Sequence, residues 1–118
     1  MKLLLALVLI LAVCGFATAQ ETSGGYTAIP WDPTNEDLVN LLNFGLQYAI
    51  PNAKAAGQIS DGNWDMTKVN SVEDQIVAGM NYQFSVEISD GAGNIAILTF
   101  VVYEDLLGYM NFVNSAVL

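Results

Sequence analysis

Apolar and polar side chains alternate over residues 81–88 of this chain. The apolar positions are Tyr82, Phe84, Val86 and Ile88, and the polar positions between them are Asn81, Gln83, Ser85 and Glu87. Because successive side chains of a strand point to opposite faces, the pattern predicts a strand with one buried and one solvated face. Residues 95–103 are apolar at nearly every position, which predicts a second strand inside the sheet. Residues 90–94 are expected to form the turn between these two strands. The alternation of apolar and polar positions begins at Trp64, and residues 108–117 are expected to form a last strand.

Upstream of these strands the apolar residues fall at helical spacing. They are Leu38, Leu41, Leu42, Gly45 and Ala49. One apolar stripe of this period predicts an amphipathic helix, with Asp32 or Thr34 as its N-cap and Pro51 ending it near residue 50. Glycine costs helix stability relative to alanine, so we expect Gly45 to let a sheet approach the helix backbone closely. Residues 51–63 are expected to form a connection without regular structure.

The order of elements predicts the fold class. A short strand at residues 26–29 comes first, one long helix follows, and four strands joined by hairpins complete the chain. This order is typical of an α+β domain in which one helix packs on one face of an antiparallel sheet.

The first residues have the pattern of a targeting segment. Lys2 gives a short positive region, residues 3–13 are apolar, and Ala17-Thr18-Ala19 offers small residues for cleavage. We therefore expect residues 1–19 to be a signal peptide and residues 20–118 to form one secreted, extracellular domain, which has no membrane partner once the signal is removed. An uncleaved anchor is the alternative, although the apolar run is short for a bilayer crossing.

Composition argues against catalysis. Removal of the signal peptide removes Cys14, the single cysteine, and the chain contains no histidine. The usual nucleophile and base pairs and soft-metal sites cannot then be assembled, so we expect no enzyme, no metal and no cofactor. A catalytic carboxylate pair is the alternative. The mature chain has two basic residues, Lys54 and Lys68, and twelve acidic residues, which give a net charge of −10. Such a charge disfavours nucleic acid as a partner. This acidity serves either solubility or steering toward a basic partner.

Residues 75–79, Gln-Ile-Val-Ala-Gly, lie where a hairpin tip is expected and carry no charge. Such a tip can enter a partner's cleft without stranding a charge there, and Gly79 can adopt a positive φ. The segment resembles the Gln-x-Val-x-Gly inhibitory loop of the cystatins, which inhibit papain-like cysteine proteases. The flanking residues 68–74 and 82–88 also resemble cystatin strands, and Gly24-Gly25 stands where cystatins carry a glycine on their N-terminal trunk.

This resemblance covers nearly the whole mature chain and implies a cystatin-like fold, with one long helix packed against a curved antiparallel sheet. It also implies reversible, competitive inhibition, because the trunk and two hairpin loops of a cystatin form a wedge that fills the protease cleft around its catalytic cysteine. The protease-binding residues implied here are Gly24, Gly25, Gln75, Ile76, Val77, Ala78, Gly79, Leu106 and Leu107.

The chain departs from the cystatin pattern in two ways. Leu106-Leu107 stands in the second loop where cystatins carry Pro-Trp, which predicts weaker inhibition. The mature chain has no cysteine for the two disulfides that secreted cystatins usually carry, so in cysteine usage it is closer to the cysteine-free stefin type.

Several alternatives remain open at this point. The segment 75–79 is also compatible with an ordinary hairpin turn, Gly24-Gly25 with a flexible tail, and Leu106-Leu107 with core residues at a strand end. Trp31 and Trp64 are expected to pack and not to recognise a partner. A cystatin-fold protein that binds without inhibiting is the main rival function. A small extracellular enzyme is a third. We expect a monomer, with a domain-swapped dimer opening at the first loop as the alternative.

Overall fold

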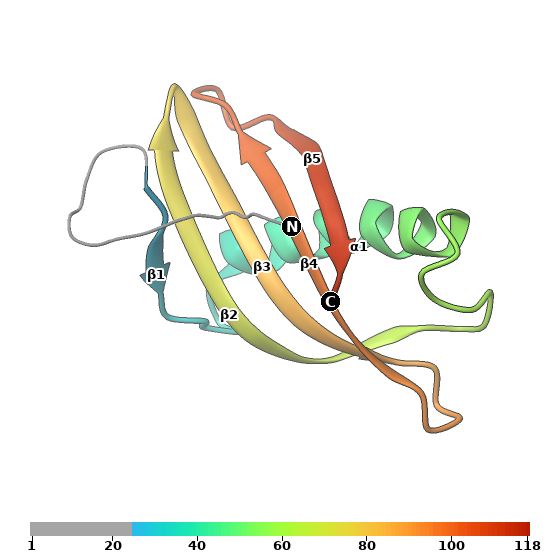
Figure 1. Cartoon of the computed structure of the whole chain (residues 1–118). Coiled ribbons are helices and arrows are strands. Elements are labelled where there is room, and N and C mark those ends of the chain that lie inside the picture. Colours follow the sequence, from blue (N-terminus) through green and yellow to red (C-terminus); the bar gives the residue numbers. More distant parts are fainter. Residues whose placement is uncertain (1–24) are drawn as a thin grey trace.

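The computed structural model of the chain describes residues 25–118. The predicted signal peptide, its cleavage site and Gly24 lie outside the described residues. The elements are β1 (Thr27–Ile29), α1 (Glu36–Ala55), β2 (Asp65–Val77), β3 (Gly79–Ser89), β4 (Ile95–Glu104) and β5 (Met110–Val117). All five strands form one antiparallel sheet in the order β1-β2-β3-β4-β5, which curves across the single helix (Figure 1). The α+β prediction is confirmed, and the apolar strand at residues 95–103 is interior to the sheet.

The start of α1 differs from the sequence prediction. Asn35 is the N-cap, and its side-chain oxygen accepts a hydrogen bond from the backbone N–H of Leu38 at 3.2 Å. The two predicted caps, Asp32 and Thr34, bond to each other in the turn before the helix. The Asp32 carboxylate accepts bonds from the Thr34 N–H at 2.9 Å and the Thr34 hydroxyl at 2.7 Å. These two residues close the turn before the helix, so neither is free to cap it.

The end of α1 also corrects the prediction. The helix continues through the exposed Pro51 to Ala55, so the first part of the segment 51–63 is helical and not irregular. A proline inside a helix removes one backbone hydrogen bond. The apolar stripe extends one turn further, however, and the burial of Ala53 against the core contributes in the opposite direction. Gly57, at φ +72°, then terminates the helix in the left-handed conformation that glycine readily adopts.

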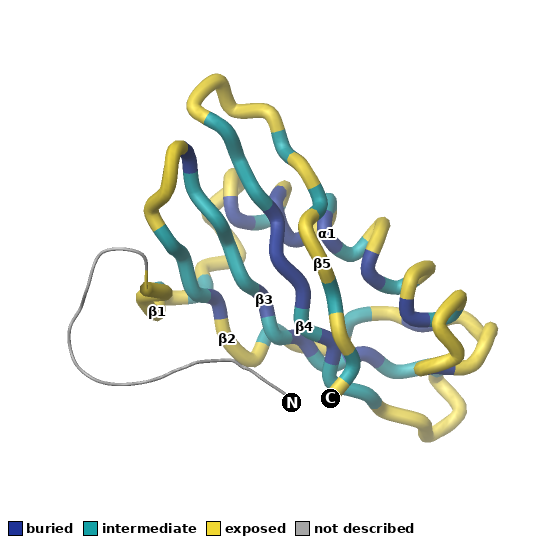
Figure 2. Tube along the Cα trace, turned by 45° about the horizontal axis from the view of Figure 1, so that its top comes forward, coloured by how far each residue is buried: buried dark blue, intermediate teal, exposed yellow. Residues whose placement is uncertain are grey.

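The core lies between α1 and the concave face of the sheet, as the buried segments in Figure 2 show. Phe84, Val86 and Ile88 of β3 lie in this core, as predicted, whereas Tyr82, the fourth residue of the predicted buried face, is half-buried. Gly45 on α1 is required there because a β-carbon would overlap the ring of Phe100 on β4. The helix therefore lies directly on the sheet, which fixes the position of β4 beneath it.

The two tryptophans pack, as expected. Trp64 is buried, and its indole N–H donates to the carbonyl of Ser60 at 2.9 Å. Trp31 is half-buried against the core. Over residues 25–118, α1 lacks the length of apolar sequence that a membrane-spanning helix requires.

Candidate functional site

The first hairpin turn joins β2 to β3 at Ala78. Val77 pairs with Gly79 across this tight turn, so the predicted loop 75–79 consists of two strand ends and one tip residue. The Ile76 side chain is 75% exposed and that of Val77 42% exposed. Two apolar side chains therefore project from an uncharged tip.

The tip is held against β4 by contacts that the sequence did not reveal. Gly79 has φ +110°, and a β-carbon there would lie 2.5 Å from the carbonyl oxygen of Glu104 and 2.8 Å from the hydroxyl of Tyr103. The Tyr103 hydroxyl donates a hydrogen bond to the carbonyl of Ala78. Only glycine satisfies both the conformation and the spacing, so the first turn is docked on its neighbour.

Gln75 lies at the base of this hairpin and is half-buried. Its side-chain oxygen accepts a hydrogen bond from the amide of Asn81 at 3.0 Å, and the two residues are cross-strand partners. The structure thus gives Gln75 a role in bracing the hairpin, beside the binding role that the sequence predicts for it.

The second hairpin turn, between β4 and β5, is organised by Asp105. One carboxylate oxygen of Asp105 accepts hydrogen bonds from the N–H groups of Leu107 and Tyr109, each at 2.9 Å. The Asp105 N–H donates to the Tyr109 carbonyl at 2.9 Å, and Gly108 has φ +90°. Leu106 and Leu107 are each 82% exposed, so the alternative that they belong to the core is wrong.

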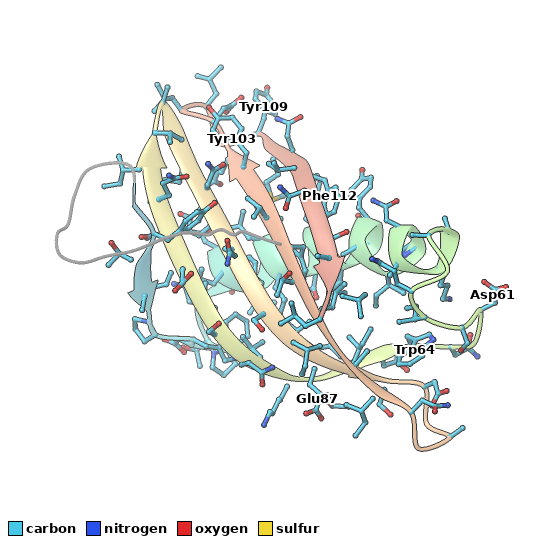
Figure 3. The ribbon with its side chains drawn as sticks, in the orientation of Figure 1. Asp61, Trp64, Glu87, Tyr103, Tyr109 and Phe112 are labelled. Carbon is cyan, nitrogen blue, oxygen red and sulfur yellow. The ribbon has the colours of Figure 1, made fainter. Side chains whose placement is uncertain are left out.

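The two turns lie at the same end of the sheet. Glu104 pairs with Met80, just after the first turn, and with Met110, just after the second. Figure 3 shows Tyr103 and Tyr109 together at this end. We call the surface formed by residues 76–79 and 105–109 the loop end. The predicted site segments are therefore neighbours, although about thirty positions separate them in the sequence.

The trunk approaches the same end of the sheet. Thr27, the first residue of β1, pairs with Asp74, close to the first turn, and the exposed Gly25 precedes it. Gly24, the other predicted trunk glycine, lies outside the described residues.

Carboxylates surround the base of the loop end on its concave side. Burial raises the pKa of the Tyr82 hydroxyl above its ordinary value. The negative charges of Glu104, Asp74 and Asp37 raise it further, in that order of size. These three carboxylates belong to β4, β2 and the first turn of α1. The tip is thus neutral while its base is acidic.

A second acidic contact lies near the trunk. Burial raises the pKa of the Glu73 carboxyl above its ordinary value. Burial also raises the pKa of the Tyr26 hydroxyl, and the charge of Glu73 adds to that effect.

The loop end combines exposed apolar groups with a fixed backbone. Its tips display apolar side chains on backbones fixed by hydrogen bonds, which favours insertion into a groove because little order is lost on binding. Among residues 25–118, no group of three or more His, Cys, Asp or Glu side chains is arranged to hold a metal ion.

Three important residues were missed by the sequence reasoning: Tyr103, Asp105 and Tyr109. The spacing of Asp105 and Gly108 is a turn signal that could have identified the second turn, and with it Tyr109. Nothing in the local sequence marks Tyr103, because its role depends on the pairing of β3 with β4 and on the reach of its ring to the opposite turn.

A known structure shares this architecture. The solved structure of a salivary cystatin from the soft tick Ornithodoros moubata resembles this chain with a TM-score of 0.50 and 21% sequence identity. The match covers 82% of this chain and 99% of the tick protein. The sequence matches no protein-family model and no curated protein. A helix packed on a curved five-stranded antiparallel sheet, with the strands in this order, is the cystatin fold.

Proposed function

We propose that this protein is a secreted inhibitor of papain-like cysteine proteases, which binds them reversibly and in competition with substrate. Its loop end and its trunk, Gly24-Gly25, form the wedge. One observation carries the proposal: the uncharged, exposed Ile76 and Val77 project beside the exposed Leu106 and Leu107 at one end of a rigid sheet.

The energetics of the second turn set the expected strength. Burying a fully exposed leucine side chain contributes about 1.5–3 kcal/mol if a pocket receives it. A buried interface tryptophan often contributes about 2 kcal/mol or more, and about 1.4 kcal/mol changes affinity tenfold. Leu106 and Leu107 thus compensate in part for the absent Pro-Trp pair, and inhibition is weaker than in a cystatin that has all three elements.

The remaining parts of the proposal follow from the sequence. Residues 1–19 are the signal peptide, the mature chain is an extracellular monomer, and it acts without a cofactor and without catalysis. Its partners are cathepsin-type proteases. The tick protein that shares the fold is named a salivary cystatin, which supports the same class of function.

The test is a titration of papain with the protein, produced as the full chain in a secreting host and purified from the medium. Residual protease activity is measured with wild type, Val77→Asp and the control Ile95→Asp. Ile95 is 63% exposed at the opposite end of the sheet, so the control adds the same charge away from the wedge. We expect wild type and Ile95→Asp to inhibit, and Val77→Asp to lose at least about 100-fold in affinity, because its carboxylate would be desolvated in the cleft.

The rival function is a cystatin-fold protein that binds a partner without inhibiting a protease. The observation that favours it is the Leu106-Leu107 pair in place of Pro-Trp. Papain that keeps full activity at micromolar wild-type protein would support this rival. Equal inhibition by wild type and Val77→Asp would instead move the inhibitory site elsewhere. Removal of the residues before Tyr26 then measures the contribution of the trunk.

A further inference from the structure

Two hairpin turns at opposite ends of β4 are fixed by the same hydrogen bonds from an aspartate, although the residue after that aspartate is Gly91, at φ +77°, in one turn and Leu106 in the other. In the turn between β3 and β4, a carboxylate oxygen of Asp90 accepts hydrogen bonds from the N–H groups of Ala92 at 2.8 Å and Asn94 at 3.2 Å. The Asp90 N–H donates to the carbonyl of Asn94 at 3.2 Å, and Gly93 has φ +97°. Asp105 makes the same three bonds with the second and fourth residues after it, and Gly108 has the same role as Gly93.

The two turns differ in the side chains they display. The turn after Asp90 carries Gly-Ala-Gly-Asn, whereas the turn after Asp105 carries Leu-Leu-Gly-Tyr. The turn after Asp90 shows what the fold needs at such a position: an aspartate, glycines and otherwise small or polar residues. The large apolar side chains of the second turn therefore exceed the structural requirement, and exposed apolar groups gathered in one patch are typical of a binding surface.

Tyr109 is the most exposed aromatic residue in the described part of the chain, at 68%. The other exposed tyrosines have partners within the molecule. Tyr48 stacks on Phe112, with ring centroids 5.5 Å apart, and the hydroxyl of Tyr26 lies in the field of Glu73. Tyr109 occupies the position that Asn94 holds in the sister turn, where the asparagine side chain donates to the other oxygen of Asp90 at 2.7 Å.

The backbone of Tyr109 is fixed on both sides. Its N–H and its carbonyl both bond to Asp105, while its ring points outward at the loop end (Figure 3). Such a side chain loses only its own two torsions when it is buried. A tyrosine also offers an apolar ring with a polar tip, which suits a pocket that is dry inside and wet at its rim.

We propose that Tyr109 is the aromatic anchor of the second turn, and that it docks on a protease surface formed by an apolar pocket with a hydrogen-bonding group at its rim. This inference rests on the proposed inhibition of cysteine proteases. It assigns the main contact of the second turn to Tyr109, with Leu106 and Leu107 packing around it.

The sister turn supplies the variant that tests this. Tyr109→Asn introduces the residue that the other turn uses at the equivalent position, so we expect the turn to keep its backbone bonds and to lose the phenol side chain. We expect papain inhibition to weaken by about 30-fold, mainly through faster dissociation. Tyr109→Phe keeps the ring and is expected to stay within about fivefold of wild type. Ile95→Ala, which removes an exposed apolar side chain at the opposite end, is the control and should leave inhibition unchanged.

A second measurement needs no variant. Hydroxyl-radical footprinting of the wild-type protein, free and bound to papain, should show Tyr109 protected in the complex and Ile95 equally reactive in both. Inhibition by Tyr109→Asn within twofold of wild type, or a Tyr109 that stays reactive in the complex, would overturn the assignment. In either case a Val77→Asp variant that no longer inhibits would leave the proposed function standing. A wild-type protein that does not inhibit would remove both.

Discussion

The two turns of the loop end are rigid for different reasons. The first turn is held from outside, by the hydroxyl of Tyr103 on the Ala78 carbonyl and by the close packing of Gly79 on β4. The second turn is held from within, by the hydrogen bonds of Asp105 to Leu107, Gly108 and Tyr109. The first turn therefore depends on tertiary structure and the second on local sequence. Substitutions that loosen the sheet should destabilise the first turn more than the second.

This difference bears on the alternative of a domain-swapped dimer. Opening the first hairpin requires the chain near Ala78 to straighten, which breaks the bond from Tyr103 and removes Gly79 from its site against Glu104. The second turn keeps all its bonds in such a rearrangement, since they are local. A swapped dimer would therefore have to give up the contacts of Tyr103 and Gly79, and the monomer stays a prediction.

The largest effect that separates the two turns is expected from a pair of glycine substitutions. Gly79→Ala places a methyl group 2.5 Å from the Glu104 carbonyl at φ +110°, so we expect a loss of about 3 kcal/mol or more in the free energy of unfolding. Gly108→Ala meets no atom within 4 Å, and its strain at φ +90° should cost about 1–2 kcal/mol. Urea unfolding of both variants measures the difference.

Papain inhibition should follow the same order, with Gly79→Ala the weaker inhibitor. Equal losses of stability in the two variants would show that the first turn does not depend on its packing against β4.

An intermediate effect is expected from the tyrosine hydroxyl that joins the first turn to β4. Tyr103→Phe removes the donor to the Ala78 carbonyl and should cost about 1 kcal/mol. Amide hydrogen exchange should accelerate at the first turn, around Gly79, and remain unchanged at Gly108. Tyr109→Phe is the matched control, because its backbone bonds do not involve the hydroxyl. Acceleration in both turns would contradict their independence.

The smallest effect concerns the strand that leads into the first turn. Glu73 has a pKa raised by burial above its ordinary value of 4.5, so the folded protein binds this proton more readily than the unfolded chain. Its contribution to stability therefore grows as the pH falls through the raised value toward 4.5, and it is unfavourable at neutral pH. We expect Glu73→Gln to be more stable than wild type at pH 7, with the difference vanishing below pH 4.5.

Thermal unfolding over a pH series measures this effect. Asp61→Asn, which removes the same charge from an exposed loop, is the control. A stability difference for Glu73→Gln that does not change with pH would rule out burial of the carboxylate as its cause.

The strands could be predicted because each depends on a period of two, and the buried face of β3 emerged residue by residue. The close approach at Gly45 followed equally from a glycine on an apolar helix face. The helix end did not, since the helix continues through Pro51 and buries Ala53 in the core, against the local rule. The cap at Asn35 was missed because Asp32 is occupied by Thr34, a competition that several similar residues in a row conceal.

In the candidate site, too, features set by local sequence could be predicted and features set by tertiary contacts could not. The position of Val77 near a hairpin tip followed from the turn pattern, and that of Leu107 was implied only by the resemblance to the cystatins; both residues are exposed. The contact of Tyr103 with Ala78 depends on the register between strands and on the length of the tyrosine side chain. A short stretch of sequence does not reveal either one. Whether these residues bind a protease remains the prediction that the papain titration tests.

The missing side chain at Gly45 has a consequence for anyone who wishes to redirect this scaffold to another target. Because the side chains of Phe100 and Val102 fill the space around a β-carbon at Gly45, this glycine controls how closely the helix approaches β4, the strand that leads from the Asp90 turn to the loop end. Randomising residues 76–78 and 106–109 should change which partner the protein binds while the helix and sheet keep their arrangement. In a library that also varies Gly45, changes in binding would be combined with changes in the packing of helix on sheet. The selected variants would then not separate the two effects.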